Sequence, residues 1–340
     1  MGQMPYSDIL DAAISGRGLT RQESRLAFDQ IMDGQWTEAQ IAAFLAALAA
    51  KGETVDEITG AAEAMREHAV RIDTGAADVI DTCGTGGTGL STFNVSTAAA
   101  LVAAGAGAKV AKHGNRTNTR ASGSANVLEA LGVNIEAAPQ TVARCLGEAG
   151  ICFCFAVRCH PAMRYAAPVR KQLGVRTIFN LLGPLTNPAG ARRQLMGVFD
   201  AAIAETIANV LGALGAVHAM VVHADGGLDE ISTTCPTTIC ELRDGHVTKY
   251  AVQPEDFDLP RATMNDLTVE SAKQSAELMR RVLAGDKGPL RDITVLNAAA
   301  ALCVADKAGS IAEAIPTAER SIDSGAARRA LEKLIALSNA

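Results

Sequence analysis

The sequence is poor in aromatic residues, which make up 4% of its 340 positions and include a single tryptophan. Aromatic side chains supply much of the buried area in many proteins. Apolar residues still account for 48% of the chain, so the core must be built mainly from Ala, Val, Leu and Ile. Closely packed aliphatic residues are typical of helices that cover a parallel sheet. The composition therefore predicts an α/β protein, and the length suits two structural units.

The sequence also lacks an excess of positive charge and a long apolar run. Its 31 basic and 37 acidic residues give a formal net charge of −6, which excludes a global positive field that would attract nucleic acid or anionic lipid. No stretch approaches the roughly 20 apolar residues of a membrane span, and the first residues do not resemble a secretory signal. We expect a cytoplasmic protein that binds neither nucleic acid nor membrane.

The eight cysteines contain no CxxC pair. This spacing excludes the common zinc and redox motifs. We expect reduced cysteines that pack as small apolar residues.

The first 72 residues repeat one helix-start pattern. Thr20, Thr37 and Thr54 are each followed three residues later by Glu or Gln, which is the capping box of a helix N-terminus. Apolar residues after the second box recur at the spacing of one buried helix face. Residues 1–72 are therefore predicted to form a helical domain. The turn-rich, helical segment at about 161–188 could reach back and complete it.

The pattern changes after residue 75, and residues 73–340 are predicted to form a larger α/β domain. Short apolar runs alternate with helical stretches, which indicates βαβ units and a mostly parallel sheet. Two runs around Asp244-Gly245 predict a hairpin at 238–252. The candidate strands before it are 78–81, 109–111, 132–135, 151–156, 195–199 and 218–223.

A glycine-rich stretch, DTCGTGGTGLSTFNVST at 81–97, follows the first of these strands and precedes a helix that begins near Asn94. Glycines let backbone N–H groups turn toward a ligand, and a helix N-terminus favours anions. The stretch has no lysine and is neither a Walker loop nor a GxGxxG fingerprint. It predicts a phosphate cradle, although an ordinary glycine-rich turn would have the same composition.

Two further segments carry charge beyond predicted strands. The first, KHGNRTNTRASGSANVLEALG at 112–132, is rich in cations and polar donors, which suits an anionic ligand or a solvated turn. The second, HADGGLDE at 223–230, ends in the adjacent carboxylates Asp229 and Glu230. Such a pair suits Mg²⁺ held partly through water and substrate oxygens, and it also occurs in ordinary exposed turns.

Four motifs together resemble one family. They are GTGGTGLSTFNVST, KHGNR followed by SGSANVLEALG, HPAM with APVRKQLGVRTIFNLLGPLTNP up to residue 188, and DGGLDEIS at 225–232. Their order and spacing are similar to those of the anthranilate phosphoribosyltransferases, and the resemblance spans nearly the whole chain. It implies a nucleoside phosphorylase/phosphoribosyltransferase-like fold. It also implies Mg²⁺ as cofactor and a homodimer formed through the N-terminal helices.

The resemblance implies transfer of the phosphoribosyl group of phosphoribosyl pyrophosphate (PRPP) to the amino nitrogen of anthranilate, a step of tryptophan biosynthesis. No strong protein nucleophile is needed for it. The implied PRPP site is Gly84, Gly87, Thr88, Thr92, Asn94, Val95, Ser96, Thr97, Lys112, Asn115, Thr119, Arg120 and Ser124. The implied anthranilate site is Gly84, His113, Asn115, His160, Tyr165, Arg170 and Gly183. The implied metal contacts are Ser96, Asp229 and Glu230.

Three positions depart from the family pattern. Thr88 stands where Asp is common, Arg120 replaces a small serine, and Asn126 replaces Asp. These changes shift the site toward positive charge and leave the acceptor open. One alternative is a related enzyme that uses another aminobenzoate-like amine. The other is a non-catalytic paralogue that binds nucleic acid, which the negative net charge disfavours.

Overall fold

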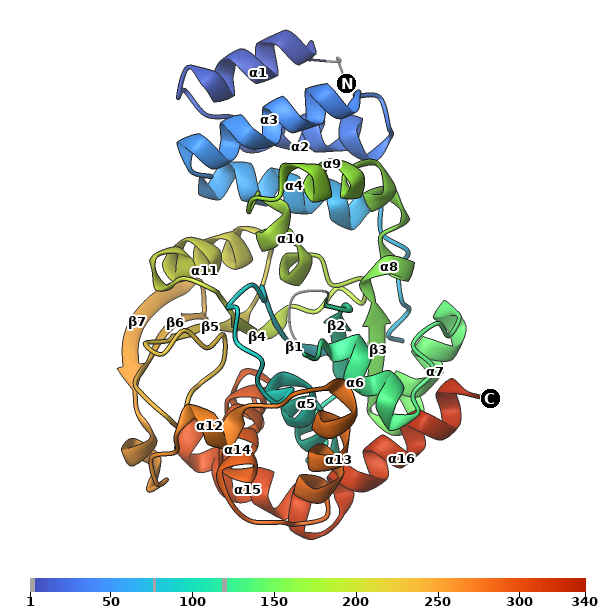
Figure 1. Cartoon of the computed structure of the whole chain (residues 1–340), viewed down its shortest axis with the longest axis vertical. Helices are drawn as coiled ribbons and strands as arrows, with labels where there is room; N and C mark the ends of the chain where they lie inside the picture. Colours follow the sequence, from blue (N-terminus) through green and yellow to red (C-terminus); the bar gives the residue numbers. More distant parts are fainter. Residues whose placement is uncertain (1–3, 76–77, 118–120) are drawn as a thin grey trace.

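The computed structural model describes residues 4–75, 78–117 and 121–340. Four helices form a layer at the N-terminal end (Figure 1): α1 (Tyr6–Ile14), α2 (Arg21–Met32), α3 (Glu38–Lys51) and α4 (Val55–Glu67). The three predicted capping boxes are confirmed. In α2, α3 and α4 the N-cap threonine accepts a backbone N–H, and the Glu or Gln side chain three residues on accepts the N-cap N–H.

A seven-stranded sheet with the order β3-β2-β1-β4-β5-β6-β7 forms the centre of the molecule. The pairs among β1 to β5 are parallel, whereas β5-β6 and β6-β7 are antiparallel. The bounds are β1 (Ile80–Gly84), β2 (Val110–Gly114), β3 (Ile151–Phe155), β4 (Arg193–Gly197), β5 (His218–Ala224), β6 (Thr237–Arg243) and β7 (His246–Val252). The predicted hairpin is confirmed: Asp244 and Gly245 both have positive φ, at 50° and 81°.

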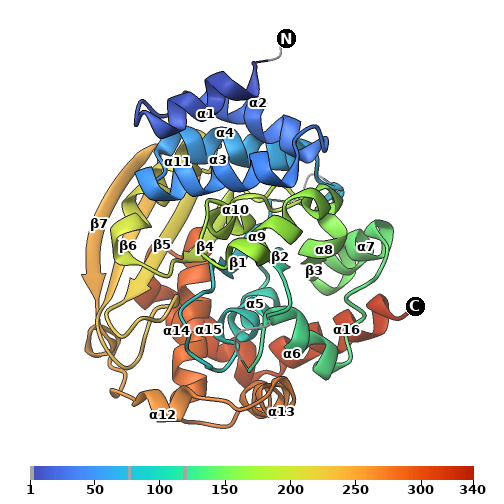
Figure 2. The same cartoon turned by 45° about the horizontal axis from the view of Figure 1, so that its top comes forward.

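The remaining helices cover the sheet. Between it and the N-terminal layer lie α8 (Ala156–Cys159), α9 (Ala167–Leu173), α10 (Phe179–Leu185) and α11 (Ala204–Ala213) (Figures 1 and 2). The others are α5 (Val95–Gly105), α6 (Ser124–Leu131), α7 (Pro139–Ala149), α12 (Met264–Leu267), α13 (Ala272–Leu283), α14 (Pro289–Val304), α15 (Ile311–Asp323) and α16 (Ala326–Ser338). Short 3₁₀ turns occupy Pro161–Tyr165, Ala201–Ile203 and Pro254–Phe257. No helix in the described part of the chain is long and apolar enough to cross a membrane.

The buried apolar residues form two clusters. The larger one joins residues of strands β1 to β5 to helices α5 and α14. The alanine-rich faces of these two helices are almost wholly buried. The smaller one joins α1–α4 to residues 162–185 and α11. In it the Phe28 ring lies 5.5 Å from that of Phe179 and 5.8 Å from that of Phe44. A segment distant in sequence therefore completes the packing of the N-terminal helices.

The predicted strand at 132–135 is wrong. Gly132, at φ 98°, ends α6, and the Asn134 N–H donates to Ser338 Oγ of α16 at 3.1 Å. Val133 and Ile135 are buried, with exposures of 4% each. Alternating buried residues in this connecting turn mimic the period of a strand, but the chain packs on a helix and pairs with no described strand.

Candidate active site

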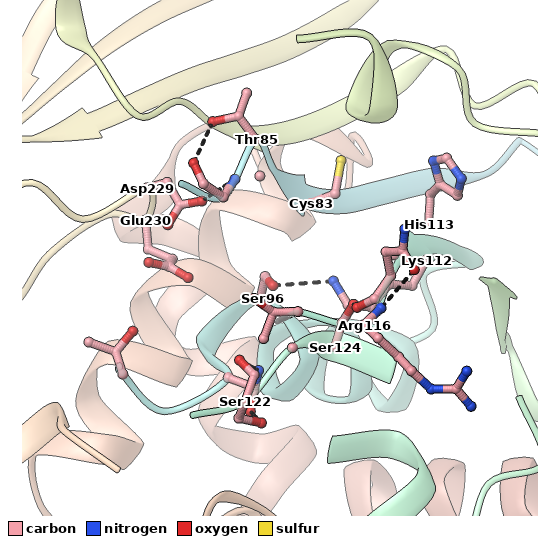
Figure 3. A pocket seen from close by; sticks show the side chains of 18 of the residues that line it. Cys83, Thr85, Ser96, Lys112, His113, Arg116, Ser122, Ser124, Asp229 and Glu230 are labelled. Carbon is pink, nitrogen blue, oxygen red and sulfur yellow. Dashed lines mark hydrogen bonds between the residues drawn. The ribbon is translucent and has the colours of Figure 1, made fainter. Parts of the chain in front are cut away.

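A polar cavity of about 250 Å³ lies beyond the carboxyl ends of β1 and β2, the usual place for ligands in open α/β sheets. We call it the first cavity, and Figure 3 shows its side chains. Its lining contains Cys83, Gly84, Thr85, Gly86, Gly87, Thr92, Phe93, Asn94, Ser96, Lys112, His113, Gly114, Asn115, Arg116, Thr117, Ser122, Gly123, Ser124, Asp229 and Glu230. The glycine-rich segment and the two charged segments singled out in the sequence thus meet at one place.

The glycine loop wraps around the carboxylate of Asp229. The Gly86 N–H donates to Asp229 Oδ2 at 3.0 Å, and Gly86 has a φ of 64°, where L side chains are strained. A Cβ at Gly84 would lie 2.4 Å from the same oxygen. Thr85 fixes the loop to β4, because its N–H donates to Gly197 O at 2.9 Å. Glycine at position 84 therefore leaves the space that the carboxylate occupies.

Lys112 places a buried cation beside the cavity. Its side chain is 2% exposed, and Nζ donates to Thr82 O and, at 3.2 Å, to Ser96 Oγ (Figure 3). Burial lowers the pKa of Lys112, and the charge of Asp81 opposes this shift. Arg116, in contrast, turns outward onto Glu129 at 2.7 Å. Of these two cations, Lys112 is therefore the one held inside.

The start of α5 is held by hydroxyl groups. Ser122 Oγ donates to Asn94 Oδ1 at 2.6 Å, and Ser275 Oγ donates to the same atom at 2.8 Å. Val95 and Thr97 are each 1% exposed and do not line the cavity. Their N–H groups already donate to Phe93 O and Asn94 O, so the structure does not bring these two implied PRPP residues to the ligand space.

Three other implied PRPP residues are not seen in the cavity lining for different reasons. Thr88 is outside the lining, and its Oγ1 accepts the Leu90 N–H at 3.3 Å. Thr119 and Arg120 lie outside the described residues.

A second cavity of about 480 Å³ adjoins the first. The two cavities share six lining residues, namely Cys83, Gly84, Thr85, His113, Gly114 and Asn115. The implied anthranilate residues His160, Arg170 and Gly183 also line it. The rest of its lining is Met65, Ala156, Val157, Pro161, Met163, Arg164, Ala167, Phe179, Asn180 and Pro184. This second cavity is mostly apolar and has room for an aromatic ring.

Tyr165 is not brought to the second cavity. Its ring packs so closely on Gly34 that a Cβ there would lie 2.5 Å from Tyr165 Cε1. The Arg164 guanidinium covers the ring at 4.6 Å. Tyr165 therefore joins the 3₁₀ turn at 161–165 to the N-terminal helices, which is a packing role.

Two neutral histidines line the second cavity. The His113 and His160 rings lie 5.1 Å apart, and His113 Nδ1 is 3.0 Å from Gly183 O. A carbonyl oxygen only accepts, so this Nδ1 carries the proton. Burial lowers the pKa of His113 to about 3 and that of His160 to about 4. The Nε2 atoms of both rings are buried and find no hydrogen-bond partner among the described residues.

These lowered pKa values predict a loss of stability in acid. In the unfolded chain both rings bind protons below about pH 6.5, whereas the folded protein keeps them neutral to about pH 4. Stability is therefore complete above pH 6.5 and falls as the pH drops, by about 1.4 kcal/mol per pH unit for each ring. Denaturant titrations at pH 7 and pH 5 should show His160→Gln losing about 2 kcal/mol less than the wild type. Equal losses would contradict it. His246→Gln, at an exposed position, is the control.

Arg170 supplies the cation of the second cavity. It lies on α9, half-buried, with its guanidinium 5.4 Å from the Phe179 ring centre. Burial lowers its pKa, and within the described residues it forms no ion pair. A half-buried guanidinium without a carboxylate partner suits an anionic substrate group.

A buried network behind the site was not predicted as part of it. Asp81 Oδ1 accepts the His113 N–H at 3.0 Å, and Asp81 Oδ2 accepts Asn187 Nδ2 at 2.7 Å. Asn187 Nδ2 also donates to Ala111 O at 2.7 Å. Burial raises the pKa of Asp81, and the charge of Lys112 opposes this shift. The network links β1, β2 and the segment after α10, and so fixes His113. Asp81 and Asn187 both lie within the sequence motifs quoted above, and this membership was the only sign of their role in the sequence.

The comparisons with known proteins agree with this geometry. Residues 76–328 match the glycosyl transferase family, a/b domain, and residues 7–69 match its helical bundle domain. The anthranilate phosphoribosyltransferase of Symbiobacterium thermophilum is 52% identical over 326 residues, covering 96% of each chain. The chain belongs to the anthranilate phosphoribosyltransferase family.

Solved structures of this family superpose closely on the chain. The Thermus thermophilus enzyme has a TM-score of 0.93 at 42% identity, covering 98% of this chain and 100% of its own. The Saccharomyces cerevisiae enzyme, solved in complex with PRPP and Mg, has a TM-score of 0.88 at 28% identity and 99% coverage of both chains. It has also been solved in complex with 4-fluoroanthranilate, with a TM-score of 0.88 at 26% identity, covering 99% of both chains. These likenesses do not favour the two alternatives left open by the sequence.

Proposed function

We propose that the chain transfers the phosphoribosyl group of PRPP to the amino nitrogen of anthranilate, releasing pyrophosphate. The observation that carries this proposal is the pair of adjoining cavities, one polar and one mostly apolar, that share six lining residues, with Gly84, His113 and Asn115 among them. PRPP would occupy the first cavity and anthranilate the second. The sugar carbon that reacts would then lie at their common wall, where the two substrates meet.

The first cavity supports the departure of pyrophosphate. Charge develops on the phosphate oxygens in an oxocarbenium-like transition state, and fixed donors stabilise it. The glycine loop, Lys112 and the hydroxyls of Ser96, Ser122 and Ser124 supply donors on opposite sides of this space (Figure 3).

Asp229, Glu230 and Ser96 provide an oxygen-only donor set, which fits Mg²⁺. The space that Gly84 leaves for the Asp229 carboxylate supports this fit. When bound, the ion would neutralise charge on the leaving pyrophosphate.

The second cavity supports binding and orientation of anthranilate. Arg170 would hold the substrate carboxylate, and the Nε2 lone pairs of His113 and His160 would accept from its amine. An aromatic amine is already neutral at pH 7, so it attacks C1 without prior deprotonation. After the C–N bond forms, the nitrogen releases a proton, which Nε2 of His113 or of His160 would accept.

The test is the loss of anthranilate fluorescence when purified enzyme, PRPP and MgCl₂ are mixed with anthranilate. Omission of enzyme, PRPP or metal should each abolish the signal change. Parallel assays with substituted aminobenzoates measure kcat/KM for the acceptor. No turnover of anthranilate, or a higher kcat/KM for another aminobenzoate, would overturn the proposal.

Arg170→Ala should raise the KM for anthranilate about 30- to 150-fold, since a charged hydrogen-bonded pair contributes about 2–3 kcal/mol. The KM for PRPP should change little, because Arg170 lines only the second cavity. Lys171→Ala, at the next, exposed position, is the matched control. An unchanged KM for anthranilate would remove Arg170 from the substrate site.

We also infer a cytoplasmic homodimer whose interface is formed by the N-terminal helices, within a helical domain of residues 1–72 completed by about 161–188. The exposed apolar side chain of Ile14, 67% accessible at the end of α1, supports an interface there. Light scattering at micromolar concentration should give twice the 35.2 kDa chain mass. A single-chain mass would contradict the dimer, and Ile14→Asp should weaken it.

A further inference from the structure

A cluster of residues that could ligate a metal lies at the end of the parallel strands opposite the active site. His218 begins β5, Glu241 lies on β6 and Cys303 on α14, and one ligand atom from each falls within 4.8 Å of the others. His218 is level with Ile80, the first residue of β1, whereas the cavities begin at Gly84. Four strand residues correspond to about 13 Å, so this cluster is separate from the proposed reaction.

The ring of His218 is held between two carboxylates. Nε2 lies 2.7 Å from Glu241 Oε1, and Nδ1 lies 3.5 Å from Asp306 Oδ1. The side chain is nearly wholly buried, at 1% exposure, and Nδ1 has no partner with hydrogen-bond geometry in the described residues. Arg193 in turn holds Asp306 at 2.5 Å. A carboxylate behind the far ring nitrogen is the arrangement that orients histidine ligands of metals.

The other two members are also placed for coordination. Glu241 Oε2 accepts the Tyr250 hydroxyl at 2.8 Å, which leaves Oε1 to face His218. The hydrogen bond from His218 lowers the pKa of Glu241, so this carboxyl is ionised. Burial raises the pKa of the Cys303 thiol to about 11. Cys303 is buried, at 2% exposure, and within the described residues its thiol makes no hydrogen bond.

We propose that His218 Nε2, Glu241 Oε1 and Cys303 Sγ bind one Zn²⁺ ion, with water as the fourth ligand. Nitrogen, carboxylate oxygen and thiolate together are a donor set that zinc prefers over magnesium. The thiol proton leaves to solvent as the Zn–S bond forms. Zinc bond lengths of about 2.0–2.3 Å place tetrahedral ligand atoms about 3.2–3.8 Å apart, so the three side chains need only small rotations.

The surroundings provide access and set the strength of binding. His218 also lines an open hollow of about 440 Å³ together with Val217 and Lys307, which gives the ion a path from solvent. Arg193, Arg243 and Lys307 line the same hollow, and their positive charges disfavour a cation. We therefore expect micromolar affinity. The bound ion would join β5, β6 and α14 where the sheet changes from parallel to antiparallel.

The test uses the whole purified protein, stripped with chelator and kept in excess MgCl₂ so that the active site is supplied. Zn²⁺ titration against a colorimetric chelator should give one equivalent bound. Co²⁺ as a probe should give a thiolate charge-transfer band. Cys303→Ala should lose the band and weaken Zn²⁺ binding at least tenfold, and His218→Gln should weaken it similarly.

Cys240→Ala is the matched control, because Cys240 is buried like Cys303 but lies on β6 and packs in the smaller apolar cluster. It should bind Zn²⁺ as the wild type does. Circular dichroism establishes that each variant is folded. If Cys303→Ala does not fold, the Co²⁺ spectrum of the wild type decides. A wild-type spectrum without a thiolate band, less than one equivalent of Zn²⁺, or unchanged affinity in folded Cys303→Ala would overturn the proposal.

Discussion

Asp229→Asn combined with Glu230→Gln should lower kcat/KM by about a thousandfold or more. Both carboxylates line the first cavity, and Asp229 is the group around which the glycine loop closes. Removing two charges that would hold Mg²⁺ leaves the charge on departing pyrophosphate without its counter-ion, and the loss of one fixed stabilising group alone costs about 10²–10³ in rate. Steady-state rates at several MgCl₂ concentrations measure the effect.

Asp225→Asn is the matched control, because Asp225 is an exposed acid in the same turn and lies outside both cavities. It should keep nearly full activity. Circular dichroism and the unfolding midpoint establish that the double variant is folded. Activity of the double variant within tenfold of the wild type would rule out these two carboxylates as the metal contacts.

Gly84→Ala should lower kcat/KM at least a hundredfold while the protein stays folded. The added Cβ would lie 2.4 Å from Asp229 Oδ2 and 3.2 Å from Asp229 Cγ. The carboxylate must then move from the position it holds against the loop, and misplacement of a catalytic group by about 1 Å can cost 10²-fold. The expected signature is an increased requirement for MgCl₂ together with a lower kcat.

Two changes in the same loop separate this effect from general disturbance of the glycines. Gly89→Ala adds a Cβ where nothing lies within 4 Å, at a φ of 74°, so it should cost some stability and little activity. Thr88→Asp restores the acid common in the family outside the cavity lining, so PRPP affinity should change by no more than about tenfold. A larger loss in Thr88→Asp than in Gly84→Ala would show that the loop acts through its side chains.

Local patterns predicted most of the fold. The capping boxes at Thr20, Thr37 and Thr54 and the Asp244-Gly245 turn are set by residues within four positions, and each is confirmed. The prediction of a strand at 132–135 was wrong because alternating apolar residues indicate which side chains are buried and not which element they pack against. A turn that packs on α16 buries alternate residues as a strand would.

The site was predicted as segments, and its three-dimensional connections were not. Motifs placed Lys112, Asp229 and Glu230 together at one cavity, as found. They gave no sign that Met65 of α4 lines the second cavity. They also gave no sign that Arg176 Nη2 donates to Gly87 O at 2.7 Å. These contacts join residues that are distant in sequence, so no local spacing encodes them.

The joining of α1–α4 with residues 162–185 in one buried cluster has a consequence for synthesis on the ribosome. At roughly 5–20 residues per second, Phe179 is added about 150 residues, and so roughly 8–30 s, after Phe28, whose ring it contacts. During that interval the nascent N-terminal helices expose the apolar face that residues 162–185 later cover. Chaperone capture in the cell should therefore concentrate on this early segment, before the chain beyond residue 185 has emerged.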